Sequence, residues 1–116
     1  MSRVAEPVPL VPPLRATVEH FLRRSRFAAR TRANYAQDLA PLLECVGGWP
    51  VSAALTHAVA AAYLAAQDHL SAGTYNRRYA ALRSLVRWCQ KQGYLEDDPL
   101  AGLERRPQAH GGPRAR

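Results

Sequence analysis

The sequence predicts an all-α protein, a compact bundle of four to five helices. Apolar residues recur three and four positions apart along four stretches of the chain, which is the spacing of one helix face. No stretch of useful length alternates apolar and polar residues as a half-buried β-strand does. The chain has 116 residues, 47% of them hydrophobic, enough for one domain that buries about two-thirds of its unfolded surface without a metal or a disulfide.

The first helix is expected from Leu14 to about Arg24, because Leu14, Val18 and Phe21 follow the helical spacing. Residues 1–13 hold four prolines and show no helical period. They are therefore expected to form a flexible arm outside the core.

A second helix is expected to begin after Thr31 and to run to about Val46, where Gly47 and Gly48 end it. Its apolar residues at helical spacing are Tyr35, Leu39, Leu42, Leu43 and Val46. Pro41 lies inside this stretch and lacks a backbone donor, so a kink about one turn back is expected, at a cost of about 3 kcal/mol.

Thr56 is expected to cap a third, alanine-rich helix that runs through His69. Val59, Tyr63 and Ala66 should face inward on this helix. Its small side chains would let a neighbouring helix approach closely.

A fourth helix is expected to start at the N-cap Ser71 and to end at Gly93. At about 100° per residue, one side carries Tyr75, Tyr79, Leu82, Leu85, Val86 and Cys89. Asn76, Arg83 and Arg87 gather roughly 120° away from that side. One face of the helix can therefore pack while another meets phosphate.

After this helix, Leu100 and Leu103 are expected to fold back onto the core. Residues 104–116 are polar and rich in Gly, Pro and Arg, so they are expected to form a disordered linker. The helical domain is thus expected over residues 14–103.

The charge of the chain favours an acidic polymer as the partner. The net charge is +7, the isoelectric point is near 10.3, and all but one of the 16 basic residues are arginine. Arginine contacts phosphate or base edges through a planar fork. No run approaches the roughly 18 apolar residues of a membrane span, and no signal peptide is present, so a cytoplasmic protein is expected.

The cysteines, histidines and tryptophans favour structural roles. Cys45 and Cys89 lie on apolar stripes, where reduced and buried thiols are expected. The histidines share no metal-ligand spacing with the cysteines, so neither a metal nor another cofactor is expected. Trp49 and Trp88 are expected to pack in the core.

Two segments, residues 30–43 and residues 71–103, carry a resemblance to a known family. The shared elements are Thr31-x-x-x-Tyr35-x-x-Asp38-Leu39, Ser71-x-x-Thr74-x-Asn76-Arg77, the Leu-Arg-Ser-Leu-x-x-Trp that follows, and an Asp-Pro-Leu after a Gly-Tyr turn. In this order and spacing they resemble the N-terminal core-binding domain of the tyrosine recombinases, which include phage integrases and Xer-type proteins. The resemblance implies a small SAM-like bundle of helices and covers residues 14–103.

In that family the core-binding domain forms one half of a clamp around duplex DNA. The resemblance therefore implies that this chain grips double-stranded DNA beside the strand-exchange site, together with other recombinase protomers on the DNA. The DNA-facing candidates are Arg30, Thr31, Arg32, Tyr35, Ser71, Thr74, Tyr75, Arg77, Arg78 and Arg83. We expect Arg30, Arg32, Arg77 and Arg83 to share one outward surface.

Several of these candidates also have a packing interpretation. Tyr35 and Tyr75 lie at apolar spacing and can belong to the core. Arg78 lies close to the apolar stripe, so it can pair with Asp38 or Asp68 across the bundle. An exposed row of arginines can also be merely a solvated helix face.

The family's chemistry needs a tyrosine nucleophile and cationic groups from a catalytic domain that follows the core-binding domain. This chain carries no such motif, so it is expected not to be an enzyme by itself. Two other functions stay open: a protein-interaction module with an acidic partner, and a freestanding helix-turn-helix-like regulator. Because no heptad seam is present, a monomer is expected in isolation.

Overall fold

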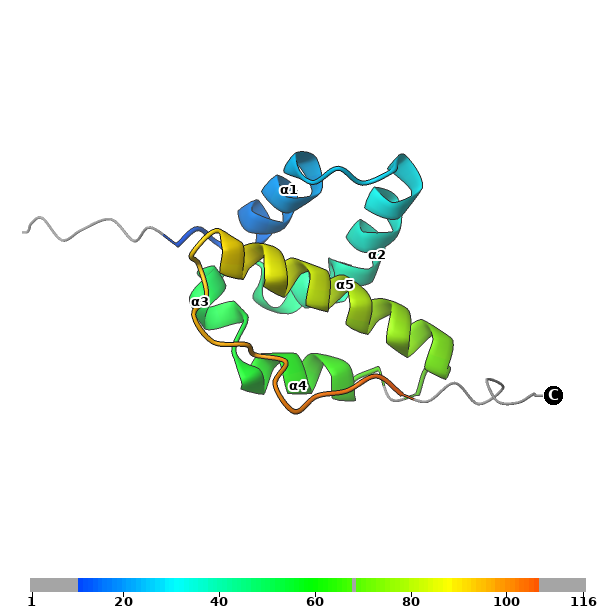
Figure 1. Cartoon of the computed structure of the whole chain (residues 1–116). Helices are drawn as coiled ribbons and strands as arrows, with labels where there is room; N and C mark the ends of the chain where they lie inside the picture. The colour runs from blue at the N-terminus through cyan, green and yellow to red at the C-terminus, as the bar shows by residue number, and fades with distance from the viewer. Residues whose placement is uncertain (1–10, 68, 107–116) are drawn as a thin grey trace, which may run out of the picture.

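The computed structural model describes residues 11–67 and 69–106, which form five helices and no β-strand (Figure 1). The helices are α1 (Leu14–Arg24), α2 (Ala29–Val46), α3 (Val51–Ala54), α4 (His57–Ala65) and α5 (Ala72–Lys91). This confirms the all-α class and the number of helices. None of the helices in the described ranges is long and apolar enough to cross a bilayer.

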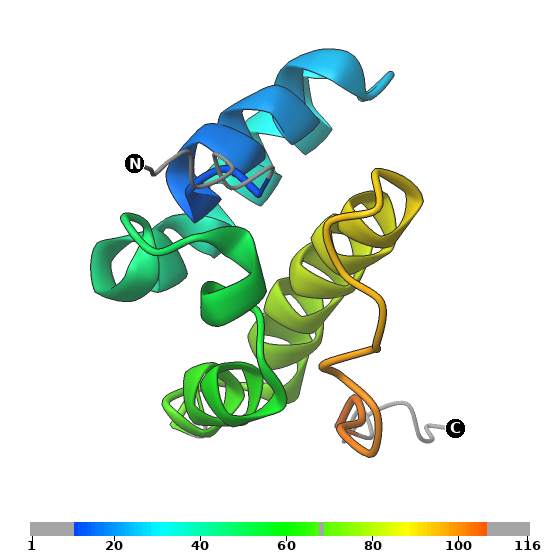
Figure 2. The ribbon, with the colours of Figure 1, turned by 90° about the vertical axis from the view of Figure 1, so that its left-hand side faces the viewer.

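Helix α5 runs through the middle of the molecule (Figures 1 and 2). Helices α1 and α2 lie on one side of it, and α3 and α4 lie on the other. The segment after α5 turns back and passes alongside it (Figure 2). Helix α5 therefore packs against α1 and α2, against α3 and α4, and against the segment that follows it.

The two predicted caps are confirmed. The Thr56 hydroxyl accepts a hydrogen bond from the Val59 N–H, and the Ser71 hydroxyl accepts one from the Thr74 N–H, each at 3.2 Å. The predicted end at Gly93 is also confirmed, since this glycine has a φ of 81° and the next amide bonds back to the Cys89 carbonyl.

Two helix boundaries differ from the sequence expectation. Helix α2 begins at Ala29, ahead of Thr31, because the Arg32 N–H already bonds to the Ala28 carbonyl. Helix α4 ends at Ala65, well before His69. The Gln67 N–H bonds to the Leu64 carbonyl three residues back, as in a 3₁₀ turn, and the α-helix does not continue. Pro41 lies inside α2 without ending it.

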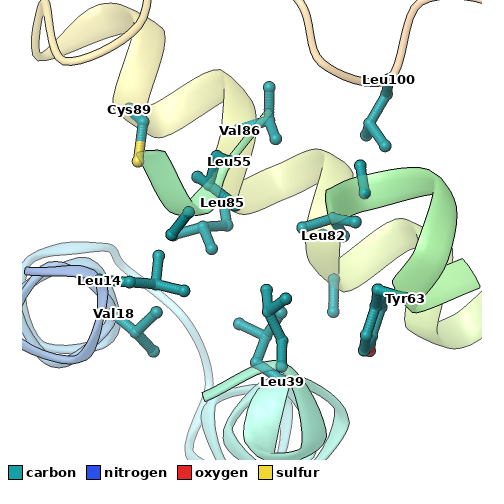
Figure 3. Packing of buried hydrophobic residues seen from close by; sticks show 14 of the residues in the cluster. Leu14, Val18, Leu39, Leu55, Tyr63, Leu82, Leu85, Val86, Cys89 and Leu100 are labelled. Atoms are coloured by element: carbon teal, nitrogen blue, oxygen red, sulfur yellow. The ribbon is translucent and has the colours of Figure 1, made fainter. Parts of the chain in front are cut away.

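The core lies between α5 and the helices on its two sides (Figure 3). Its largest fully buried members are Leu14, Val18, Phe21, Leu39, Val51, Leu82, Leu85, Val86, Cys89 and Leu100. Leu100 thus folds back as expected. Burial raises the pKa of the Cys89 thiol to about 12, so this thiol stays protonated.

Three expectations about packing are wrong. Trp49 is 48% exposed, because it lies on the turn after α2 and only its backbone bonds to α1. Cys45 is exposed near the end of α2, and Ala66 is exposed at the end of α4. Trp49 and Ala66 lie where a helix has ended, so the helical period no longer decides which way their side chains face. Cys45 lies within α2 but outside the buried row of Leu39, Leu42 and Val46.

Both ends of the described chain pack more closely than expected. The Pro12 carbonyl accepts a bond from the Val51 N–H, so the last residues of the expected arm lie against α3. Residues 104–106, assigned from the sequence to the linker, lie along α5, where the Arg106 backbone bonds to Asn76. Residues 1–10 and 107–116 lie outside the described residues.

We predict that Leu82→Ala lowers the free energy of unfolding by roughly 2–5 kcal/mol, because this side chain is fully buried in the middle of α5. Chemical denaturation measures the loss. Leu22→Ala is the control, since Leu22 is half-buried at the edge of the core and its loss should be smaller. Equal losses would show that α5 is not the centre of the core.

Candidate nucleic-acid interface

Two stretches of the chain carry many cations and no acidic residue. Residues 20–37 contain Arg23, Arg24, Arg26, Arg30 and Arg32, and α5 contains Arg77, Arg78, Arg83, Arg87 and Lys91. The acidic residue that follows the first stretch is Asp38, whose side chain is 1% exposed. The cations nearest to this buried carboxylate are Arg77 and Arg78 of α5.

Asp38 holds Arg77 in place on the side of α5 that faces α2. The Nε of Arg77 donates to both carboxylate oxygens of Asp38 at 3.2 Å. The side chain of Arg77 is nevertheless 51% exposed. Because the bonds of Arg77 to Asp38 use only Nε, its two Nη groups keep donors for an outside acceptor.

Arg78 belongs to a buried polar network. Its Nε lies 4.0 Å from an Asp38 oxygen, and its Nη1 donates to the Gln67 side chain. Gln67 in turn donates to the Tyr63 carbonyl, and the Tyr63 hydroxyl donates to the Asp38 carbonyl at 2.6 Å. The pairing of Arg78 with Asp38 is thus confirmed, whereas Asp68 lies outside the described residues.

Arg83 turns away from α2 toward the segment after α5. Its Nη1 donates to Asp98 at 2.9 Å, and its Nη2 donates to the Tyr79 hydroxyl. Burial by itself raises the pKa of Asp98, but the hydrogen bonds from Arg83 and from the Leu100 N–H, with the charges of Arg83 and Arg87, lower it below its ordinary value. Arg83 therefore holds the segment after α5 against this helix, and its guanidinium is engaged within the fold.

Tyr35 and Tyr75 both pack. Tyr35 lies edge-on to Phe27, with ring centroids 5.0 Å apart, and stacks on Phe21 at 6.2 Å. Tyr75 is buried, and the Arg106 guanidinium lies 4.0 Å from its ring centroid. Neither tyrosine presents its ring freely to a ligand.

The first turn of α5 is occupied by contacts within the chain. Ser71 accepts from the Thr74 N–H and donates to the Thr74 hydroxyl. Asn76 donates to the Arg106 carbonyl at 2.7 Å and accepts from the Arg106 N–H at 2.8 Å. Asn76, placed from the sequence beside Arg83 on a polar face, thus anchors the segment after α5.

The start of α2 divides its candidates between two roles. Arg30 is exposed and makes no hydrogen bond or ion pair with any described residue. Thr31 is half-buried. Arg32 donates to the carbonyls of Leu22 and Phe27, at the end of α1 and in the following turn, so it braces that turn.

The four arginines expected on one surface are therefore divided by the structure. Arg77 and Arg83 are six positions apart, a separation of about 120° around the helix, and they reach different flanks of α5. Arg32 is bound to carbonyls near the end of α1. Arg30 stands on α2 with Asn34 and Asp38 at successive four-residue steps, a row that leads to Arg77.

Two further cations lie near Arg77: Lys91, and Arg87, which the sequence placed on the polar face of this helix but not among the DNA-facing candidates. Arg87 and Lys91 are exposed and lie within about 80° of Arg77 around α5. Neither makes a hydrogen bond or ion pair with a described residue, although Arg87 lowers the pKa of Asp98 through its charge. We call Arg30, Asn34, Arg77, Arg87 and Lys91 the α2–α5 basic surface.

Within the described part of the chain, no group of three or more His, Cys, Asp or Glu side chains could hold a metal ion. Comparisons with protein-family models, with curated proteins and with solved structures find no match for this chain.

We predict that Asp38→Asn lowers the free energy of unfolding by roughly 3 kcal/mol, because two arginines lose their buried partner. Glu44→Gln is the control, since this carboxylate is exposed on the same helix and should cost less than about 0.5 kcal/mol. Denaturant titration of the two variants measures both values. A loss at Asp38 no greater than at Glu44 would contradict the structural role of this ion pair.

We predict that the Arg83–Asp98 pair makes stability depend on pH. Because the pKa of Asp98 is lowered by folding, the stabilisation is present above the unfolded-state pKa of about 3.9 and is lost as the pH falls through the folded-state pKa. The difference in unfolding free energy between the wild type and Asp98→Asn should therefore narrow between about pH 6 and pH 3. A difference that does not change with pH would contradict the pair.

Proposed function

We propose that this chain binds duplex DNA through the α2–α5 basic surface, as the core-binding domain of a tyrosine recombinase. The observation that carries the proposal is the exposed face of α5, where Arg77, Arg87 and Lys91 lie together on a helix without an acidic residue. The resemblance of residues 30–43 and 71–103 to the family supplies the name of the domain. It also assigns the DNA to the same two helices.

The shape of this surface suits a nucleic-acid backbone. The exposed face of α5 has small residues next to its cations, namely Gly73, Ala80 and Ser84. Small side chains let a phosphate strand approach the helix closely, while the arginines reach past them. The 20 residues of α5 span about 30 Å, and the major groove of B-DNA is about 12 Å wide, so one helix of this length can lie across it.

The charge balance supports a polyanion over a single anion. The cations of this surface are spread over two helices, and Asp38 is buried between Arg77 and Arg78. The carboxylate of Asp38 therefore repels an approaching phosphate little, and it holds Arg77 ready for contact. Contacts of this kind position DNA without reading its sequence.

The chain alone is proposed to bind without cutting. The tyrosine hydroxyls that form hydrogen bonds in the described residues, those of Tyr63 and Tyr79, donate to backbone carbonyls of the fold. Burial raises the pKa of Tyr63 to about 12, which opposes formation of a phenolate nucleophile. DNA cleavage would require the catalytic domain that the resemblance implies.

We predict that binding of the 116-residue chain to duplex DNA depends steeply on salt. If about four cations contact phosphates, log K falls against log[salt] with a slope of about −3.6. Arg30→Ala should flatten the slope by about one unit, since Arg30 makes no other bond that its removal would break. Fluorescence anisotropy of a labelled duplex measures the slopes.

The control is Arg15→Ala. Arg15 is also an exposed arginine, but it donates to the Leu43 carbonyl near the opposite end of α2, about 20 Å along the helix from Arg30. Its removal should leave the slope unchanged. A slope near zero, with a complex that survives nuclease treatment, would favour an acidic protein partner. A stable dimer with a two-fold symmetric site would favour the helix-turn-helix regulator.

A further inference from the structure

We infer that a groove between the end of α1 and the C-terminal half of α5 binds a phosphate of the DNA backbone. The inference rests on the proposed function and says where one strand lies. The groove has a volume of about 280 Å³. Its walls come from the end of α1 and the turn that follows on one side, and from α5 on the other.

The floor of the groove is aromatic. Phe21, Phe27 and Trp88 line it, and the ring of Phe21 meets the other two edge-to-face at centroid distances of 5.3 and 5.7 Å. Phe21 is buried, while Phe27 and Trp88 are half-exposed. Such a floor offers apolar contact, which suits the deoxyribose that adjoins a phosphate.

The rim of the groove carries the groups that would hold an anion. Arg87 and Lys91 stand one helical turn apart on α5, and Ser25 and Ser84 line the groove from the turn after α1 and from α5. None of these four side chains makes a hydrogen bond with a described residue. The rim therefore presents two cations and two hydroxyl donors that the fold itself does not use.

Two positive charges one turn apart on a helix repel each other, at a cost of about 0.2–0.5 kcal/mol. The end of a helix favours one cation in its last turn, a position that Lys91 already fills. Arg87 lies a full turn earlier, so helix stability alone does not account for the pair. An anion held between Arg87 and Lys91 would be attracted to both cations and would offset their mutual repulsion.

The surroundings favour a strand of phosphates over an isolated anion. Arg23, Arg24 and Arg26 are exposed beside the groove, at the end of α1 and in the turn that follows. Asp98, whose pKa Arg87 lowers, lies on the Arg83 side of Arg87, where its charge is paired with that of Arg83. A polyanion passing through the groove would thus meet positive charge along its path.

Trp88 provides a reporter of this site. In the full chain with Trp49→Phe, Trp88 is the remaining tryptophan, and Trp49 is exposed so its replacement should leave the fold intact. Addition of duplex DNA at low salt should protect Trp88 from iodide quenching, with the same midpoint as binding measured by anisotropy. Circular dichroism checks that each variant remains folded.

The double variant Arg87→Ala/Lys91→Ala should flatten the salt slope by about two units and abolish the protection of Trp88. The control is Arg15→Ala, which should change neither readout. Inorganic phosphate is the second probe. Inorganic phosphate and duplex are compared at the same total concentration of phosphate groups. If both protect Trp88 equally, the groove is a site for free anions, and the assignment to a DNA strand is overturned.

Failure of this inference is distinct from failure of the proposed function. If the duplex binds and the slope responds to Arg30→Ala, but Trp88 stays accessible and the double variant binds normally, the groove assignment is overturned and the proposed function stands. If no duplex binds at low salt, both are overturned.

Discussion

The burial of α5 is the constraint on which the rest of this structure depends. Seven residues of this helix are buried: Tyr75, Tyr79, Ala81, Leu82, Leu85, Val86 and Cys89. They meet α1 and α2 on one side and the turned-back Leu100 on another (Figure 3). A strip of α5 remains for solvent, and that strip is cationic with small residues between the charges. The core and the candidate binding surface are therefore two sides of one helix.

Asp38 connects the core to the basic surface. A lone carboxylate buried at this junction would be costly, but the guanidiniums of Arg77 and Arg78 compensate its charge. The same contact fixes the direction of Arg77 while leaving half of its side chain exposed. A single acidic residue thus helps to join α2 to α5 and to present a cation at their junction.

The arginines show that a basic composition does not define a binding site. Arg83 is paired with Asp98, Arg32 with carbonyls around the end of α1, and Arg78 with Gln67. These side chains form hydrogen bonds with buried or half-buried polar groups. Such groups would lower the stability of the fold if they had no partner. The cations that the fold leaves unpaired on α2 and α5, Arg30, Arg87 and Lys91, are the ones best placed to meet an external anion.

The sequence by itself determined the all-α class, the helices around Phe21, Leu39 and Leu82, and the caps at Thr56 and Ser71. These features depend on residues within one or two helical turns, so local spacing and local hydrogen bonds decide them. The tertiary structure alone decided which arginines stay free. The partners of Arg77, Arg83 and Asn76 lie 39, 15 and 30 positions away in the chain, and only packing brings them together. For the same reason the sequence could not show that residues 104–106 lie along α5, or that Arg87 and Lys91 face a groove built from α1.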